Sequence, residues 1–580
     1  MTSFRIEHLP FNKATLRDWA LPDGRHSNWP VVYAINGRNQ VYIGETLNAV
    51  VRMRQHLDSP SKQQEKLGAV RIIVDDTFNK SACLDLESYL IRLFAGDGRF
   101  RVLNRNEGIT DADYFDRARY RATFTEIFEQ LRAQGLFARS LPEIENSDLF
   151  KLSPYKALNQ DQAVAIEDIL EGLFADVERG EGSTIVVQGD PGTGKTVVGI
   201  FLMKLLRDIQ MSTPSHKSDA DSLFSEFFVE GFPELLRDFR MGLVVPQQSL
   251  RASIKDVFRR TPGLHPSMVL TPFEVGKSVE RFDLLIVDES HRLTQRANQS
   301  AGTLNRAFTD ITRSLFGADD LSRTQLDWVR AQSAHQIFLL DAAQSVRPAD
   351  LPAQVLRELV DEARKTRRHY PLLSQMRVLA GGDYISYVRD VLSGEAASVL
   401  AFPTYDLRFF DDLSEMATAI RDRDQEVGLA RMVSGYAWDW KSRKDSAAFD
   451  IELDGIRLRW NRMQVDWINS PGAIDEVGSI HTVQGYDLNY AGVIIGRDLR
   501  FDRHRGHLRV DRASYFDKKG KENNPARGLI YTDDDLLRFV TNIYGVLLTR
   551  GMRGTYVYVC DPDLREYLRQ FFGSNPTPAL

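Results

Sequence analysis

The chain contains 580 residues, of which 43% are hydrophobic and 27% charged, a composition typical of a globular protein with several domains. No apolar run is long enough to cross a bilayer, and charges stand where a secretory signal needs an apolar stretch, so we expect a cytoplasmic protein without a membrane partner. The net charge of -6 excludes a generally basic nucleic-acid binder but leaves room for a local basic cleft. Cys83 and Cys560 lie in apolar runs without metal-type neighbours, so we expect both to be reduced.

Strand and helix patterns divide the chain into four expected regions. Residues 1–110 alternate short strands and helices in one small domain. Residues 111–150 predict a polar amphipathic helix and a loop, which is typical of a linker. Residues 151–368 and 369–580 each repeat strand, loop and helix, which favours parallel sheets with crossover helices. The predicted fold class is therefore α/β, with a small mixed domain followed by two tandem parallel-sheet domains.

In the first region, a β-hairpin and a helix are predicted in succession. Val31 to Ile35 form the first strand, Asn36-Gly37 supplies the turn, and Val41 to Ile43 form the second strand. Six residues of this region carry groups that can act on a phosphate: Tyr33, Tyr42, Arg52, His56, Glu87 and Asn104. Each also has an ordinary structural explanation: hairpin tyrosines usually pack, helical arginines are usually solvated, and Glu87 could pair with Arg92.

The segments VVY, YIG, RMRQH, the acidic Glu87 and LNRNEG follow the order and approximate spacing of the GIY-YIG nucleases, which this region resembles from about residue 30 to 108. The resemblance implies that Glu87 holds one divalent ion, Mg²⁺ or Mn²⁺, and that Arg52 stabilises charge on the scissile phosphate. It further implies supporting roles around the attacking water: activation by Tyr33 with His56, positioning by Tyr42, and support of the site by Asn104. Val31-Val32 replace the Gly-Ile of the family name, and the tyrosine is retained.

The strongest signal in the chain is a glycine-rich loop between a predicted strand, Ile185 to Gln188, and an apolar helix. In such a loop the backbone N–H groups and the helix N-terminus face phosphates, the lysine reaches the β- and γ-phosphates, and the hydroxyl binds Mg²⁺. The sequence therefore predicts an ATP site with Mg²⁺. The loop matches G-x-x-x-x-G-K-[S/T] with Gly189, Asp190, Pro191, Gly192, Thr193, Gly194, Lys195 and Thr196.

A second buried strand, Leu284 to Val287, ends in Asp288 and Glu289. A carboxylate at the tip of such a strand can hold Mg²⁺ opposite Thr196. Glu289 is then placed to orient or deprotonate the attacking water. An acidic pair at a strand end often caps the next helix, but beside a phosphate loop the catalytic role is favoured.

Further polar residues follow or precede apolar strands later in the chain. Gln344 could sense the γ-phosphate, and arginines far from the loop in sequence make sense if a second domain closes over ATP and neutralises phosphoryl charge. Taken alone, each of these arginines would more commonly form a surface ion pair. The candidates are Asp341, Gln344, Arg377, Gln484, Gly485, Asp487, Arg550 and Arg553.

The ordered set of LNQDQ, the phosphate loop, VVPQQSLRASI, DESH, DAAQSV, SQMR, HTVQGYD and LLTRGMRG resembles the superfamily-one helicases, and most of all the Schlafen-type helicase domain. The resemblance covers about residues 157 to 562 and implies two RecA-like domains with ATP in the cleft between them. It implies that Gln162 reads the adenine, that Gln344 couples the domains, and that Arg377 and Arg550 are arginine fingers. Residues 244–249 and 481–484, the latter including Gln484 beside Gly485, would lie near the nucleic acid.

Three segments are less typical of that pattern. The motif LDAAQ stands where many relatives have a Gly-Asp pair, which makes the coupling role of Gln344 less secure than the role of Lys195. Residues 294–335 and 497–535 resemble insertions without an assigned role. The basic run from Arg497 to Lys521 is either a solvated loop or a contact for a nucleic-acid strand.

These patterns together predict an ATP-dependent nucleic-acid translocase or helicase fused to a metal-dependent endonuclease. DNA is the favoured substrate and RNA the alternative, and an oligomer is possible but not indicated. By analogy with prokaryotic fusions, we expect a role against phage or other foreign DNA. The alternatives are a repair or RNA-processing enzyme, and a nucleotide-gated binding module whose nuclease domain only grips nucleic acid.

Overall fold

The computed structural model describes residues 4–19, 23–59, 63, 65–104, 113–212, 223–229, 231–296, 302–341, 346–375, 378–380, 382–463, 466–483, 486–524 and 527–573. The chain forms two compact units. The first contains Met1–Phe174, Ile200–Phe239 and Ser253–Met268, and the second contains Ala175–Gly199, Arg240–Ala252 and Val269–Leu580. Among the described helices, none has the length and apolarity needed to span a membrane.

The first unit is built on a five-stranded mixed sheet in the order β1-β4-β2-β3-β5. The hairpin expected near Tyr33 is present, because β2 and β3 pair antiparallel with Tyr33 opposite Gly44. β1 extends the sheet beyond β4, and β5 pairs parallel with β3. The strands are β1 (Phe4–Pro10), β2 (Val31–Asn36), β3 (Gln40–Thr46), β4 (Ala69–Asp75) and β5 (Arg101–Val102).

Helices cover both faces of this sheet because its strands alternate apolar side chains on each side. Tyr33 and its same-face neighbours pack with α1 (Lys13–Trp19) and α2 (Ala49–Asp58). The opposite face, with Val32 and Ala34, packs against α4 (Lys80–Asp97).

The segment predicted as a linker contributes to the same core as α4. Phe124 and Phe128 of α5 (Arg117–Ala133) are fully buried, and Phe128 lies against Phe137 with ring centroids 4.7 Å apart. α6 (Leu141–Glu145) and α7 (Asp148–Lys151) continue this layer. The apolar stripe of α5 therefore faces a partner, as a helix with one apolar face requires.

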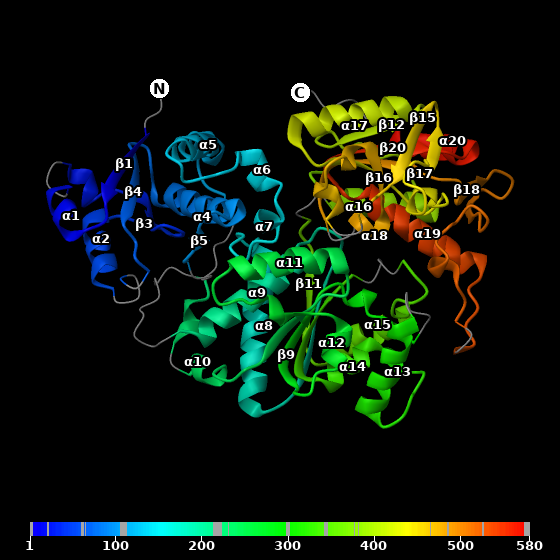
Figure 1. Ribbon diagram of the computed structural model, residues 1–580, viewed down its shortest axis with the longest axis horizontal. Coiled ribbons are helices and arrows are strands. Elements are labelled where there is room, and N and C mark those ends of the chain that lie inside the picture. The colour runs from blue at the N-terminus through cyan, green and yellow to red at the C-terminus, as the bar shows by residue number, and fades with distance from the viewer. Residues whose placement is uncertain are drawn as a thin grey trace. The chain divides into compact units, whose positions relative to one another are not determined.

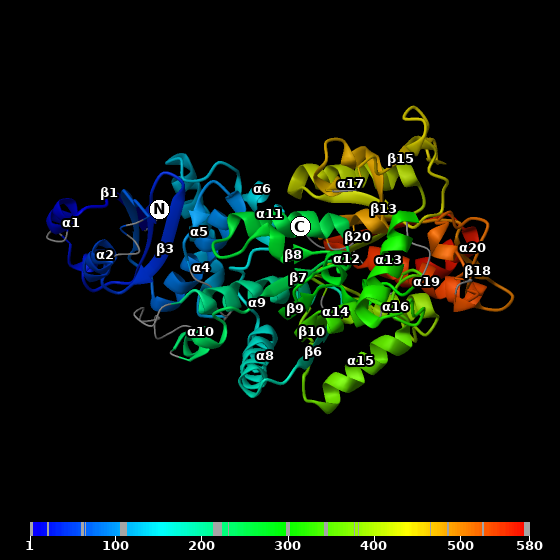
Figure 2. The same cartoon turned by 60° about the horizontal axis from the view of Figure 1, so that its bottom comes forward.

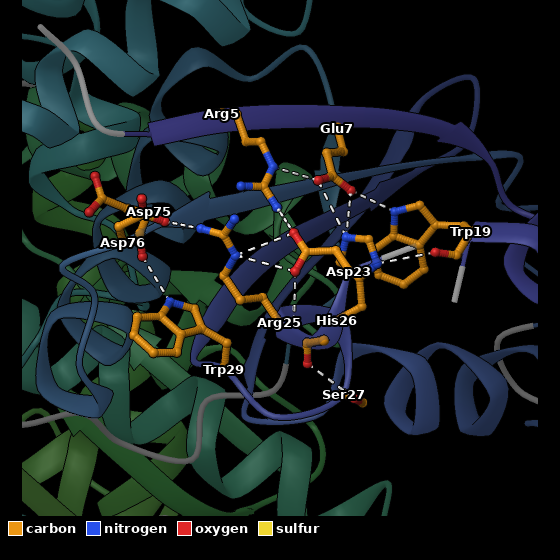
Figure 3. A network of polar contacts seen from close by, with 11 residues as sticks. Arg5, Glu7, Trp19, Asp23, Arg25, His26, Ser27, Trp29, Asp75 and Asp76 are labelled. Atoms are coloured by element: carbon orange, nitrogen blue, oxygen red, sulfur yellow. Dashed lines mark hydrogen bonds and ion pairs between the residues drawn. The ribbon is translucent and has the colours of Figure 1, made fainter. Parts of the chain in front are cut away.

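A network of polar contacts joins β1 to α1 and to His26 (Figure 3). Glu7 of β1 accepts hydrogen bonds from Arg5 Nε at 2.7 Å and Trp19 Nε1 at 2.5 Å, and His26 Nε2 lies 3.1 Å from its carboxylate. The Trp19 and His26 rings stack with centroids 3.9 Å apart. Although burial raises it, the hydrogen bonds from Arg5 and Trp19 hold the pKa of Glu7 below its usual value.

The second unit contains a six-stranded, fully parallel sheet in the order β11-β6-β10-β9-β7-β8, which we call the first parallel sheet (Figure 1). α14 (Gln325–Ala331) and α15 (Ala353–Lys365) pack on one of its faces (Figure 2). Its strands are β6 (Ser183–Gly189), β7 (Met241–Val244), β8 (Val269–Leu270), β9 (Phe282–Val287), β10 (Ser333–Leu340) and β11 (His369–Leu372).

A seven-stranded sheet follows, in the order β12-β20-β17-β13-β16-β15-β14, which we call the second parallel sheet. All of its pairs are parallel except the edge pair β14–β15. α17 (Leu413–Val427) covers one face, and α16 (Gly382–Ser393) and α19 (Asp533–Leu548) cover the other (Figure 1). Its strands are β12 (Asp406–Phe410), β13 (Ala430–Ser434), β14 (Ile451–Leu453), β15 (Ile456–Trp460), β16 (Glu476–Ser479), β17 (Leu488–Ile495) and β20 (Gly551–Val559).

The prediction of an α/β fold with two tandem parallel sheets is therefore confirmed. Of the two unassigned insertions, the first holds α13 (Gly302–Phe316), whose Phe308 and Ile311 pack on Trp328 of α14. The second holds the hairpin β18 (Leu499–Asp502) and β19 (His507–Val510). The remaining helices are α8 (Gln160–Arg179), α9 (Lys195–Gln210), α10 (Phe232–Leu235), α11 (Gln248–Arg260), α12 (Pro272–Gly276), α18 (Ile480–Val483) and α20 (Pro562–Phe572).

Candidate functional site

The glycine-rich loop joins the end of β6 to the start of α9, as the sequence predicts. Gly192 and Gly194 have φ of 88° and 82°, a backbone that favours glycine. A Cβ at Gly189 would lie 2.4 Å from Thr193 Oγ1, so the loop also requires glycine there on steric grounds. Lys195 Nζ donates to the carbonyl oxygens of Gly189 at 2.7 Å and Asp190 at 2.9 Å. The lysine is thus held across the mouth of the loop, where it can meet phosphate oxygens.

A hydroxyl and a carboxylate meet beside this loop. Thr196 Oγ1 donates to Asp288 Oδ2 at 2.9 Å, and Lys195 Nζ lies 3.7 Å from Asp341 Oδ2. Burial and the neighbouring charge of Glu289 raise the pKa of Asp288 to about 7. Oxygen ligands next to a phosphate-binding loop are what Mg²⁺ prefers, so these side chains fit Mg²⁺ bound with nucleotide phosphates.

Glu289 follows directly and has an unusual backbone, with φ of 48° in the left-handed region. This geometry is uncommon for a residue with a side chain, and such outliers cluster at functional sites. His291 Nε2 lies 3.0 Å from Glu289 Oε2 in the turn Ser290–Arg292. Although burial opposes it, this hydrogen bond and the charge of His291 lower the pKa of Glu289. His291 is the last letter of the DESH motif, but the sequence alone assigned it no role.

Two further residues without an assigned role in the sequence touch the loop. One follows β11 of the first parallel sheet, and the other lies on α16, in the part of the unit built on the second parallel sheet, which we call the second parallel-sheet half. Arg389 Nη2 of α16 lies 2.7 Å from Asp190 Oδ1. Gln375 Nε2 donates to the Pro191 carbonyl at 2.5 Å. The SQMR motif contains Gln375 and so gave a signal, whereas Arg389 stands on a helix without a recognisable motif.

Several predicted residues cannot be placed against the loop. Gln344, Arg377, Gln484 and Gly485 lie outside the described residues. Gln162 belongs to the first unit, where it is 1% exposed and its Oε1 accepts from Asn159 N at 3.2 Å. The roles given to these five residues remain predictions.

Arg550 is buried within the second parallel-sheet half at 2% exposure. Its Nη1 donates to the Tyr486 carbonyl at 3.2 Å. The arginine therefore joins the LLTRGMRG motif to the HTVQGYD motif, and its role as an arginine finger remains a prediction.

Segments predicted to lie near nucleic acid meet at His481. Gln247 Nε2 donates to the His481 carbonyl at 3.4 Å, and Arg347 Nη2 lies 2.5 Å from Nδ1 of the imidazole. Asp517 Oδ2 lies 3.6 Å from its Nε2. Burial, followed by the charge of Arg347, lowers the pKa of His481 to about 4, so the ring is neutral near pH 7.

Part of the basic run of residues 497–521 is paired with acidic side chains. Arg500 pairs with Asp511, and Arg512 Nε lies 2.8 Å from Asp533 Oδ1. Arg503 Nε lies 2.6 Å from Asp563 Oδ1. These pairs hold part of the run on the chain's own charged surface, and a contact of this run with a nucleic-acid strand remains a prediction.

In the first unit, Tyr33, His56 and Arg52 converge. The Tyr33 hydroxyl lies 2.7 Å from His56 Nε2 and accepts from Arg52 Nε at 3.4 Å. Burial, and then Tyr42, raises the pKa of Tyr33 well above its usual range, whereas Arg52 opposes the shift. Tyr42 completes the cluster, with its ring centroid 5.0 Å from that of His56. The phenol is therefore neutral and hydrogen-bonded to a group that can accept a proton.

Asn104 and Gly44 shape this cluster. The Asn104 side chain bonds both backbone groups of Ile43, accepting from the nitrogen at 3.1 Å and donating to the oxygen at 2.8 Å. A Cβ at Gly44 would lie 2.3 Å from the Tyr33 hydroxyl oxygen, so only glycine leaves room for it. Gly44 belongs to the YIG motif, but the sequence alone assigned it no role.

Glu87 lies on α4, half-buried, and its charge acts on both Tyr33 and Cys83. Among the described residues, no three His, Cys, Asp or Glu side chains gather where they could share a metal ion. A carboxylate oxygen suits Mg²⁺ or Mn²⁺, so Glu87 fits an ion that takes its other ligands from water and substrate.

The parallel sheets and the loop between β6 and α9 define a nucleotide-binding α/β protein. Residues 182–561 match the family described as Schlafen group 3, DNA/RNA helicase domain, and the chain belongs to this family. The prediction of a Schlafen-type helicase domain is thus confirmed.

Individual proteins similar to this chain share less than 30% of their residues with it over the matched regions. An uncharacterized protein of Saccharomyces cerevisiae is 29% identical over 420 residues, which cover 66% of this chain and 83% of that protein. Replication factor C small subunit 1 of Pyrobaculum islandicum is 25% identical over 177 residues, 30% of this chain and 43% of that one. A crystal structure of Pif1 helicase from Bacteroides in complex with ADP-AlF3 and ssDNA is 10% identical, with a TM-score of 0.24, covering 67% of this chain and 91% of that one.

Proposed function

We propose that the chain is an ATP-driven translocase or helicase acting on nucleic acid, with DNA the favoured substrate, and that its N-terminal domain is a divalent-metal-dependent GIY-YIG endonuclease. The proposal of a motor rests mainly on one observation. Lys195, Thr196, Asp288 and Glu289 follow the carboxyl ends of β6 and β9 in the first parallel sheet, and the side chains of Thr196 and Asp288 are hydrogen-bonded there. A fused motor and nuclease suit the destruction of foreign DNA such as phage genomes, and repair or RNA processing is the alternative use of the same parts.

In the motor, the loop N–H groups and Lys195 bind the β- and γ-phosphates of ATP. Thr196 and Asp288 would hold Mg²⁺, which supplies neutralisation of phosphate charge. Glu289 orients and deprotonates the attacking water, and its ionised form is favoured by His291. The resemblance adds Gln162 at the adenine, Gln344 as coupler, and Arg377 and Arg550 as arginine fingers.

In the nuclease domain, Glu87 would hold the ion, which acts as a Lewis acid on the scissile phosphate. Arg52 lies beside Tyr33 and can stabilise charge on that phosphate. Tyr42 would position the water. Because the Tyr33 phenol is neutral, it would activate the water by taking a proton from it while giving its own proton to His56, to which it is hydrogen-bonded at 2.7 Å.

The test is a cleavage assay on single-stranded, double-stranded and branched DNA and on single-stranded RNA with Mg²⁺ or Mn²⁺, comparing the wild type with Glu87→Ala. We expect the wild type to cut and Glu87→Ala to be inactive while it retains ATP hydrolysis. Cutting of RNA alone would favour the RNA-processing alternative. No cutting of any substrate, with ATPase activity intact, would leave the nuclease domain as a module that only grips nucleic acid.

A further inference from the structure

Residues 511–524 and 527–531 are the described part of the second insertion between β19 and α19, and we call them the bridging segment. It is anchored on the second parallel-sheet half, because Asp511 N donates to the Asp498 carbonyl at 2.8 Å and Phe516 N donates to the Tyr436 carbonyl at 2.7 Å. At its tip, Asn524 and Leu529 exchange backbone hydrogen bonds.

The tip makes three hydrogen bonds to the first parallel-sheet half. Asn524 Nδ2 donates to the Arg296 carbonyl at 2.5 Å, and Asn524 is only 4% exposed. Arg527 Nη1 donates to Gln295 Oε1, and the Tyr531 hydroxyl donates to the Pro348 carbonyl at 3.0 Å. Two of the three acceptors are backbone carbonyls, so these contacts hold the backbone at Arg296 and Pro348 in place.

The acceptors lie on two segments that leave the ATP site. Gln295 follows Glu289 by a single short turn. Its backbone nitrogen donates to the Ala349 carbonyl at 3.0 Å and its side chain donates to the Pro348 carbonyl at 2.7 Å. The chain after β9 and the chain after β10 are therefore joined at Gln295, which the bridging segment holds from the other half.

We infer that Asn524, Arg527 and Tyr531 are positioning residues for ATP hydrolysis, an inference that rests on the proposed motor function. They hold the segment of Glu289 from the second parallel-sheet half. Glu289 depends on such support because its left-handed backbone persists only where its surroundings enforce it. When the second parallel-sheet half contacts the first through the bridging segment, the contact stabilises the position of Glu289, the residue proposed to orient the attacking water.

The experiment compares the full chain with Tyr531→Phe, with Asn524→Ala/Tyr531→Phe and with Arg527→Gln, measuring steady-state ATP hydrolysis with and without oligo-dT and oligo-U. We expect kcat of the double variant to fall about tenfold while KM for ATP changes by less than about threefold, because each lost hydrogen bond disturbs geometry rather than phosphate contacts. Arg527→Lys should recover part of the rate lost in Arg527→Gln. The matched control is His504→Ala/Arg505→Ala, two exposed positions in the turn of the β18–β19 hairpin of the same insertion.

Three results would overturn the inference. Unchanged kcat in the double variant, with an active wild type, removes the positioning role and leaves the motor proposal intact. Parallel loss of kcat, ATP affinity and thermal midpoint shows a merely structural role, and the mild Tyr531→Phe variant separates this from a folding failure. A wild type that hydrolyses no ATP with any nucleic acid overturns the motor proposal and the inference together.

Discussion

At the scale of single residues, Glu289 is the group on which ATP hydrolysis is expected to depend. Glu289→Gln keeps the volume of the side chain but removes the carboxylate that accepts a proton, so kcat should fall by about 100-fold or more. Binding of ATP should persist because the loop and Lys195 are unchanged. Stopped-flow binding of a fluorescent ATP analogue, together with phosphate release, checks both expectations. Full activity in this variant would move the role of base to another group.

Gly44 gives a second residue-scale prediction. A methyl group there would meet the Tyr33 hydroxyl at 2.3 Å, so Gly44→Ala should displace Tyr33 and its contacts with His56 and Arg52. We expect a loss of nuclease activity and a destabilisation of about 1–3 kcal/mol in chemical denaturation of the first unit. Gly68→Ala is the matched control, because a Cβ there meets nothing within 4 Å. Equal cutting by Gly44→Ala would exclude Tyr33 from the reaction.

At the scale of elements, α5 tests whether residues 111–150 belong to the first unit's core. Phe128 is fully buried beside Phe137, so Phe128→Ala should lower the free energy of unfolding by about 3–5 kcal/mol. Glu126→Ala on the exposed face of α5 should change it by less than about 0.5 kcal/mol. Similar small effects of both substitutions would show that α5 behaves as an independent linker helix.

The contact between α18 and its surroundings predicts a pH dependence. The pKa of His481 falls from 6.5 to about 4 in the folded chain, which therefore holds the neutral imidazole between Arg347 and Asp517. Its contribution to stability is complete above pH 6.5 and is lost as the pH falls from about 6.5 toward about 4, because the unfolded state binds the proton first. Denaturant melts across this range should show a shallower pH slope for His481→Gln than for the wild type. Identical slopes would place the acid sensitivity elsewhere.

At the scale of the whole molecule, the proposed motor site and the proposed nuclease site share one chain, and we expect them to be coupled. Lys195→Ala removes the cation expected to bind phosphates, so it should abolish ATP hydrolysis and also change the rate or pattern of DNA cutting. Gel analysis of cutting with and without ATP measures this, and Glu87→Ala is the reciprocal control. Coupling is absent if Lys195→Ala cuts every substrate as the wild type does.

How well the sequence predicts a feature of the fold or site depends on how far apart in the chain the contacting residues lie. The phosphate loop is local, so the strand, glycines and Lys195 that define it are visible in twelve consecutive letters, residues 185–196. The hairpin of Tyr33 is visible for the same reason. Arg389 and Asn524 were not foreseen, because each acquires meaning only from a partner roughly 200 residues away in the chain. His291 and Gly44 lie inside recognised motifs, but their roles depend on atomic distances that spacing does not convey.

The order of strands in the first parallel sheet has a consequence for the chain during its synthesis. β6, which leads into the phosphate loop, lies between β10 and β11, and β11 begins roughly 180 residues after β6 ends. At about 5–20 residues per second, a ribosome takes about 10 to 40 s to cover that interval. During this time the apolar β6 has not yet paired with both β10 and β11, so we expect newly made chains to need chaperone protection at this strand. We also expect them to gain the capacity to bind ATP only late in translation.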